Sequence, residues 1–63
     1  METYEIRGIY PDGYHHKSIV VVEDQRDAIA IAQGLRKVTT IFVIAVYDVV
    51  DGHMVFYDKL QAH

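Results

Sequence analysis

The chain has 63 residues, with six basic residues, nine acidic residues and no cysteine. This length predicts a single domain spanning residues 1–63, and a domain of this size buries only about 60% of the surface that its unfolded chain exposes. The absence of cysteine excludes disulfides and thiolate metal sites, and it is typical of a cytoplasmic protein. Association with another chain is then the simplest remaining source of stability.

The net charge of −3 argues against a surface that binds nucleic acid. Arg36 and Lys37 are the one adjacent basic pair, and they are expected at the end of a helix, where they complement its dipole. Met1 to Arg7 lacks the apolar core of a secretory signal. The longest apolar run, Ile41 to Tyr47, has seven residues, whereas a membrane helix needs about 20. We therefore expect neither nucleic acid nor membrane among the partners.

The first third of the chain has the pattern of a β-hairpin. Thr3 to Tyr10 alternates in polarity with a period of two residues, which is typical of a strand. The segment Tyr10 to Tyr14 contains Pro-Asp-Gly and predicts a type I turn followed by a glycine bulge. A second strand is predicted from His15 to Val22, in a register that places Gly8 opposite His16.

A helix is predicted after this hairpin. Asp24 is a suitable N-cap, and Asp27 lies near the positive end of the helix dipole. Ile29 falls outside the apolar stripe and is expected at its flank or exposed, whereas Gly34 is expected either to allow close approach of another backbone or to mark the beginning of the helix end. At about 100° per residue, the residues of the stripe are Ala28, Ile31, Ala32, Leu35 and Val38.

The segment Thr39 to Val50 is apolar on both faces of a predicted third strand, which is normal for a strand that is covered on both sides. Asp51-Gly52 predicts a two-residue turn into a fourth strand, His53 to Leu60. The resulting register places Val46 opposite Tyr57.

These elements predict an α+β fold with the order ββαββ, in which one helix packs on one face of a four-stranded, mainly antiparallel sheet. We prefer the strand order 2-1-3-4, because small α+β domains favour antiparallel neighbours. In this order a right-handed connection through the helix links the second strand to the third. The order 1-2-3-4, with the second and third strands parallel, is the alternative.

One short helix covers at most one face of this sheet, so an apolar face remains. Leaving such a face in water is unusual for a monomer, and we expect a homodimer formed by sheet-on-sheet packing or by joined strand edges. The alternatives are a strand hidden by sheet twist and polar neighbours, or an obligate different partner. The predicted oligomer interface is Phe42, Ile44, Val46, Val55 and Tyr57. If the helix covers that face, the interface is instead Ile41, Val43, Tyr47, Met54 and Phe56.

Four histidines raise the question of a metal site, but their positions disfavour one. His15 and His16 are adjacent in a strand and point to opposite faces. His53 lies beside a turn, and His63 is the last residue. We therefore predict neither a metal nor a cofactor.

The hairpin provides the candidate ligand or contact site, because glycine opposite His16 leaves room for a ring or a ligand. Two tyrosines bracket the first turn and are expected to stack across the hairpin. The candidate contact residues are Gly8, His16, Tyr10 and Tyr14.

No catalytic residue is predicted. Asp48 and Asp58 are expected on opposite faces, so they do not form an acid/base pair. Ser18 is the only serine, and it lacks the histidine and carboxylate pattern of an activated nucleophile. We therefore expect a protein that is not an enzyme.

We expect a small, non-enzymatic, homo-oligomeric protein that binds another protein, as an accessory protein or inhibitor. One alternative is a small-molecule binding module with a pocket at the helix–sheet or dimer seam. The turn Asp12-Gly13-Tyr14 followed by an alanine-rich helix resembles antitoxins of the HicB type over the hairpin and the helix. The resemblance implies a second alternative, an antitoxin-like regulator, and no residue roles are carried over from it.

Overall fold

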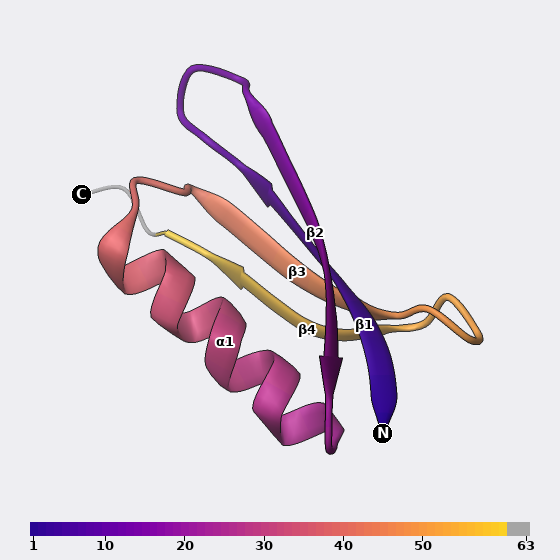
Figure 1. Cartoon of the computed structure of the whole chain (residues 1–63). Helices are drawn as coiled ribbons and strands as arrows, with labels where there is room; N and C mark the ends of the chain where they lie inside the picture. The colour runs from indigo at the N-terminus through magenta and orange to yellow at the C-terminus, as the bar shows by residue number, and fades with distance from the viewer. Residues whose placement is uncertain (61–63) are drawn as a thin grey trace.

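The computed structural model describes residues 1–60, which form two hairpins separated by a helix (Figure 1). The elements are β1 Glu2–Ile9, β2 His15–Val22, α1 Gln25–Val38, β3 Val43–Asp48 and β4 Met54–Lys59. The strands form one sheet in the order β2-β1-β3-β4, and every neighbouring pair is antiparallel. The predicted α+β ββαββ fold and its strand order are therefore confirmed. His63 lies outside the described residues.

The turn between β1 and β2 follows its sequence closely. The Gly13 amide donates to the Tyr10 carbonyl at 2.9 Å, and Gly13 has a φ of 91°, as a type I turn followed by a glycine bulge requires. The Tyr14 amide donates to the Asp12 carboxylate at 3.0 Å. Because the turn type fixes the hairpin register, the predicted pairing of β1 with β2 is also confirmed.

The turn between β3 and β4 is longer than the predicted two residues. The Asp48 side chain accepts a hydrogen bond from the Val50 amide, and the Asp48 carbonyl accepts one from Gly52 at 2.8 Å. The Asp48 amide donates to the His53 carbonyl and closes the loop. An aspartate that bonds the backbone two residues ahead begins a turn early. The loop therefore starts at Asp48 rather than at Asp51.

The longer turn and a β-bulge change the register of β3 with β4. Val46 lies opposite Phe56, and the pairing shifts between Val46 and Tyr47. Tyr57 lies opposite Ala45 rather than opposite Val46, so the predicted register of this hairpin is wrong. A bulge places one extra residue on one strand and reverses the face of the residues beyond it.

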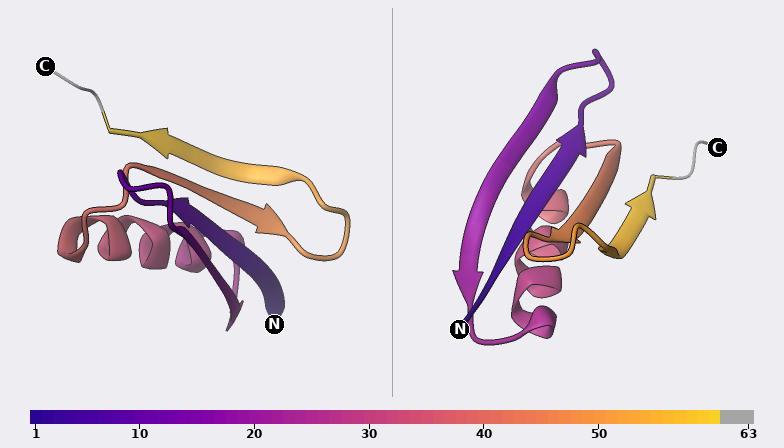
Figure 2. Two further views of the ribbon diagram at one scale, coloured as in Figure 1. Left: turned by 90° about the horizontal axis from the view of Figure 1, so that it is seen from above. Right: turned by 90° about the vertical axis from the view of Figure 1, so that its right-hand side faces the viewer.

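The helix covers one face of the sheet and leaves the other uncovered (Figure 2). Ala28 and Ala32 face the sheet from α1 and are fully buried. Because alanine is small, the helix axis approaches the strands closely at this point. The buried core consists of Tyr4, Ile6, Val22, Ala28, Ala32, Ile41, Ile44 and Val46.

The buried stripe of α1 differs from the predicted one. Ile31 and Val38 are 44% and 81% exposed, whereas Ile29 is half-buried. The contact of α1 with the sheet is centred on Ala28 and Ala32. Arg36 lies two turns after Ile29, on the same side of α1, and its side chain reaches β4. There Arg36 Nη1 lies 2.5 Å from Asp58 Oδ2, an ion pair that does not have hydrogen-bond geometry. The helix is thus rotated toward β4, and its opposite flank stays in solvent.

Gly34 has neither of its predicted roles. The helix continues to Val38, so the glycine does not mark the beginning of its end. A Cβ atom built on Gly34 would meet no heavy atom of residues 1–60 within 4 Å, so no backbone approaches it closely.

The predicted oligomer interface is divided by this packing. Ile44 and Val46 have no exposed surface, because their face of β3 is the one that α1 covers. They cannot line an external interface, and their inclusion is wrong. Phe42 and Val55 are half-buried, and Tyr57 is 55% exposed on the opposite face. The sequence could not decide this division because β3 is apolar on both faces.

Candidate functional site

The face of the sheet opposite α1, here called the open face, is the main candidate for a functional surface. Side chains alternate between the faces of a strand, and direct partners on neighbouring strands share a face. Every second residue of a strand therefore belongs to the open face, and so does the residue paired with it on the neighbouring strand. Its residues are Thr3, Glu5, Arg7, Ile9, His15, Lys17, Ile19, Val21, Val43, Ala45, Tyr47, Met54, Tyr57 and Lys59.

A chain of charges crosses the centre of the open face. Glu5 is 9% exposed and accepts two hydrogen bonds from Arg7, at 2.9 and 3.3 Å. Lys17, on the neighbouring strand β2, places its Nζ 3.8 Å from the same carboxylate. The Arg7 guanidinium also stacks on Tyr47, 4.6 Å from the ring centroid. Glu5 thus contacts two cations, and one of them also lies over an aromatic ring.

These contacts shift two pKa values in opposite directions. The hydrogen bond from Arg7 lowers the pKa of the Glu5 carboxyl, against the opposing effect of its partial burial. The same hydrogen bond raises the pKa of the Arg7 guanidinium. Both groups are therefore charged at neutral pH, and the pair is a fixed electrostatic feature of the face.

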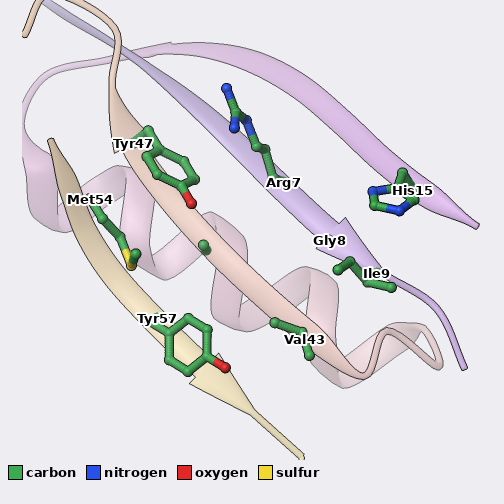
Figure 3. Close-up of a pocket in the computed structure, with 9 residues that line it drawn as sticks. Arg7, Gly8, Ile9, His15, Val43, Tyr47, Met54 and Tyr57 are labelled. Carbon is green, nitrogen blue, oxygen red and sulfur yellow. The ribbon is translucent and has the colours of Figure 1, made fainter. Parts of the chain in front are cut away.

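A shallow hollow of about 330 Å³ lies beside this pair (Figure 3). All four strands contribute to it, and side chains of Tyr47 and Tyr57 rise from neighbouring strands along it. Arg7 and His15 supply its nitrogen atoms. It is lined by Arg7, Gly8, Ile9, His15, Val43, Ala45, Tyr47, Met54 and Tyr57.

The open face differs in charge from the rest of the chain. It holds three of the six cationic side chains, Arg7, Lys17 and Lys59, but only Glu5 among the nine carboxylates. Its formal charge is therefore +2, whereas the remainder of the chain carries −5. Exposed apolar side chains surround these charges, including Met54 and Tyr57, which are 51% and 55% exposed. The arrangement is suited to binding a molecule that has both negative charge and apolar or aromatic groups.

The predicted contact residues do not form one ligand site. Gly8 lies opposite His16, as predicted, but the space beside the glycine is filled by Ile41. A Cβ atom at Gly8 would lie 3.1 and 3.2 Å from carbons of Ile41. The Tyr10 and Tyr14 rings lie together across the hairpin with centroids 5.8 Å apart, but their planes are tilted by 49° rather than stacked, and Tyr14 is exposed. The expected cavity for a ring or ligand beside Gly8 is therefore absent from the described chain.

The hollow on the open face uses His15 rather than His16. The two histidines lie on opposite faces of β2, and His16 is half-buried on the helix side. Arg7 and His15 line this hollow but were not among the site residues predicted from the sequence. The alternation of β1 and β2 already grouped them on one face, but only the position of α1 shows which face is open.

Two arrangements of polar groups are poorly suited to catalysis. His16 Nε2 lies 3.3 Å from the Ser18 hydroxyl, and no carboxylate of residues 1–60 contacts this histidine. Asp48 and Asp58 share the helix side of the sheet, because each pairs with a residue of that face, and the prediction of opposite faces is wrong. Asp48 is committed to the second turn and Asp58 to its ion pair with Arg36.

Within residues 1–60 no group of three or more histidine, cysteine or acidic side chains is placed to hold a metal ion. Among the same residues, α1 is too short and too polar to cross a membrane. Comparison of the chain with protein-family models, with curated proteins and with solved structures finds no match.

Proposed function

We propose that this is a small, non-enzymatic, homo-oligomeric protein that acts by binding an acidic polypeptide segment on its open face. The observation that carries the proposal is a positively charged, partly aromatic sheet face on a chain that is otherwise acidic. The helix shields the other face, so the open face is the extended surface where strand side chains remain available.

Charge favours an acidic partner over a second copy on this face. Packing two open faces together would bring two surfaces of charge +2 into contact, which opposes the sheet-on-sheet homodimer considered from the sequence. An acidic segment instead gains attraction to Lys17 and Lys59, whose ammonium groups are exposed. Glu5 neutralises part of both Arg7 and Lys17, so the attraction comes from the net charge of +2 that the face keeps after these pairs are counted.

The hollow gives such a segment a place for an anchor side chain. Val43 and Ala45 give it an apolar part of its lining, and the rings of Tyr47 and Tyr57 rise beside it. An aromatic side chain that enters it would be desolvated beside Tyr57 and Met54, which are half exposed without a partner. Interface energy is usually concentrated in a few buried aromatic anchors of this kind.

The experiment uses two labelled peptides of equal length, one alternating glutamate with phenylalanine and one alternating lysine with phenylalanine. Fluorescence anisotropy gives the dissociation constant of each with the full chain. We expect the glutamate peptide to bind at least about tenfold more tightly, with a preference that weakens as salt is added. Equal affinities for the two peptides would refute an electrostatically selective open face.

A pair of variants locates the binding. Tyr57→Ser removes a wall of the hollow and should weaken the glutamate peptide by about 2 kcal/mol, or about thirtyfold in Kd. Ile31→Ser is the control, because Ile31 is 44% exposed on the helix, away from the open face. The control should bind the peptide as the wild type does. A loss shared equally by both variants would show that the peptide does not bind in the hollow.

The hollow also supports the second function, a small-molecule binding module. Its volume of about 330 Å³ is near the lower end of ligand sites. Arginine held against an aromatic ring suits a planar carboxylate, and benzoate is the probe. Saturable changes in the backbone amide signals of Arg7, Tyr47 and Tyr57 on benzoate titration, without peptide binding, would favour this function. The antitoxin-like alternative stays a prediction.

A further inference from the structure

We infer that the outer edge of β2 is a self-association site that pairs antiparallel with β2 of a second copy of this chain. The inference rests on the homo-oligomeric part of the proposed function and is independent of peptide binding on the open face. It joins two sheets edge to edge, so both open faces remain accessible.

The two edges of the sheet differ in their protection against strand pairing. At one edge, β4 has six residues, contains Asp58 and Lys59, and is bulged against β3. At the other, β2 has eight residues and pairs with β1 without interruption, and Lys17 is its one lysine or acidic residue. Short strands, charges and bulges are the features that keep natural edges from pairing. Of the two edges, β2 is therefore the one prepared to accept a strand.

The hydrogen-bond pattern identifies which groups of β2 face outward. The Tyr10 amide donates to the Tyr14 carbonyl, and hydrogen-bonded pairs alternate with non-hydrogen-bonded pairs along an antiparallel ladder. The backbone groups of His16, Ser18 and Val20 are therefore directed toward β1. The intervening residues of β2, from His15 through Ile19 to Val21, direct their amides and carbonyls away from β1. The opposite edge of β1 agrees with this phase, because the carbonyls of Ile9 and Thr3 accept hydrogen bonds from the β3 side.

Charge selects the register of the new pair. With the twofold axis at Val20, Lys17 of each copy lies opposite Glu23 of the other. Registers shifted by two, four or six residues place Lys17 opposite Val21, Ile19 or a second Lys17, and none of these gains an opposite charge. Glu23 follows β2 directly, and the next residue, Asp24, is still extended at φ −151° and ψ 174°. Glu23 itself lies in the bend that leads from β2 into α1, so its exposed side chain, rather than a further residue of the strand, supplies this contact.

The same register brings apolar side chains together. Ile19 and Val21 are 57% and 59% exposed on the open face, and each would lie opposite the other across the joined edge. On the helix face, the half-buried Val20 would meet its own copy at the axis. Cross-strand pairs of β-branched residues stabilise a sheet, and the joined edge would also satisfy backbone groups that otherwise face water.

Charge reversal provides the test, with sedimentation equilibrium as the measurement. The wild type should sediment as a dimer at micromolar concentration. Lys17→Glu creates two carboxylate pairs at the joined edge, and Glu23→Lys creates two ammonium pairs. Each variant alone should raise the dimer dissociation constant at least about tenfold. An equimolar mixture should restore dimers, because each mixed pair again has opposite charges.

Two controls separate loss of pairing from loss of folding. Circular dichroism should show wild-type structure for Glu23→Lys, because Glu23 takes part in no ion pair within residues 1–60. Ile19→Pro removes an outward amide without removing a β1–β2 hydrogen bond, and should give a folded monomer. The inference is overturned if the wild type is monomeric, or if the charge variants dimerise as the wild type does. Tyr57→Ser tests the open face alone and should leave the dimer mass unchanged.

Discussion

Replacement of Gly8 by alanine tests the packing that closes the core beneath β1. The new Cβ atom would lie 3.1 Å from Ile41 Cδ1 and 3.2 Å from Ile41 Cγ2, and Ile41 is only 2% exposed. Overpacking a core of this kind costs about 1–3 kcal/mol. Alanine recovers roughly 0.5–1 kcal/mol of the entropic cost of glycine in a strand. We therefore expect Gly8→Ala to lower the free energy of unfolding by about 1 kcal/mol, which is the difference between the middles of these two ranges.

Urea unfolding followed by circular dichroism measures this change, and Gly34→Ala is the matched control. Gly34 lies inside α1 with no heavy atom of residues 1–60 near its missing Cβ, so alanine there should stabilise the protein by about 1 kcal/mol. In thermal unfolding the two substitutions should shift Tm in opposite directions, by about 4–8 °C for each kcal/mol.

A double variant identifies Ile41 as the cause. Ile41→Val removes the Cδ1 atom that is nearest to the new methyl group, so Gly8→Ala should cost less in that background than in the wild type. The reasoning is refuted if Gly8→Ala is as stable as the wild type, or if its cost is the same in both backgrounds.

Three further predictions concern single groups. The hydrogen bond from Arg7 lowers the pKa of Glu5. The contribution of Glu5 to stability is therefore present above the unfolded pKa of about 4.3 and is lost as the pH falls through the lower folded value. In urea unfolding, Glu5→Gln should weaken this dependence of stability on acid pH. The hydrogen bond to Glu2, aided by burial, raises the pKa of Tyr4 to about 12. Stability should therefore fall as pH rises from about 10 through that value, and ultraviolet titration should show the Tyr4 phenol ionising near pH 12, a signal that Tyr4→Phe removes. Asp24→Ala removes the side chain that accepts from the Asp27 amide at 3.1 Å, and it should cost about 1 kcal/mol in the same unfolding assay unless another group caps the helix.

Edge pairing and open-face binding would place two binding surfaces at right angles on one small sheet. The joined edges of β2 would align two open faces in one larger surface, in which Lys17 pairs with Glu23 of the other copy and Lys59 and the Arg7–Glu5 pair remain on each face. A partner with two acidic segments would then gain from binding both faces at once. Monomeric variants such as Ile19→Pro should lose that gain.

The candidate site could be predicted only in part. The alternation of β1 and β2 groups Glu5, Arg7 and Lys17 on one face, and the structure shows Glu5 paired with both cations. The hollow beside them requires Tyr57 to share a face with Ala45, and the bulge after Val46 produces that arrangement. A bulge depends on how two strands pair, so the sequence of either strand alone does not predict it.

Local chemistry alone determined the hairpin of β1 and β2, the N-cap at Asp24 and the order of the elements along the chain. The preference for the strand order 2-1-3-4 rests on a general tendency toward antiparallel neighbours, and the pairing of β1 with β3 decided it. Turn residues and capping side chains act within a few positions of the chain, so their effects are visible in a short segment. Tertiary structure decided which face of β3 is buried, because that strand is apolar on both sides. The close contacts of Ile41 with Gly8 and of the alanines of α1 with the sheet bury one face, and they leave the charged and aromatic face in solvent.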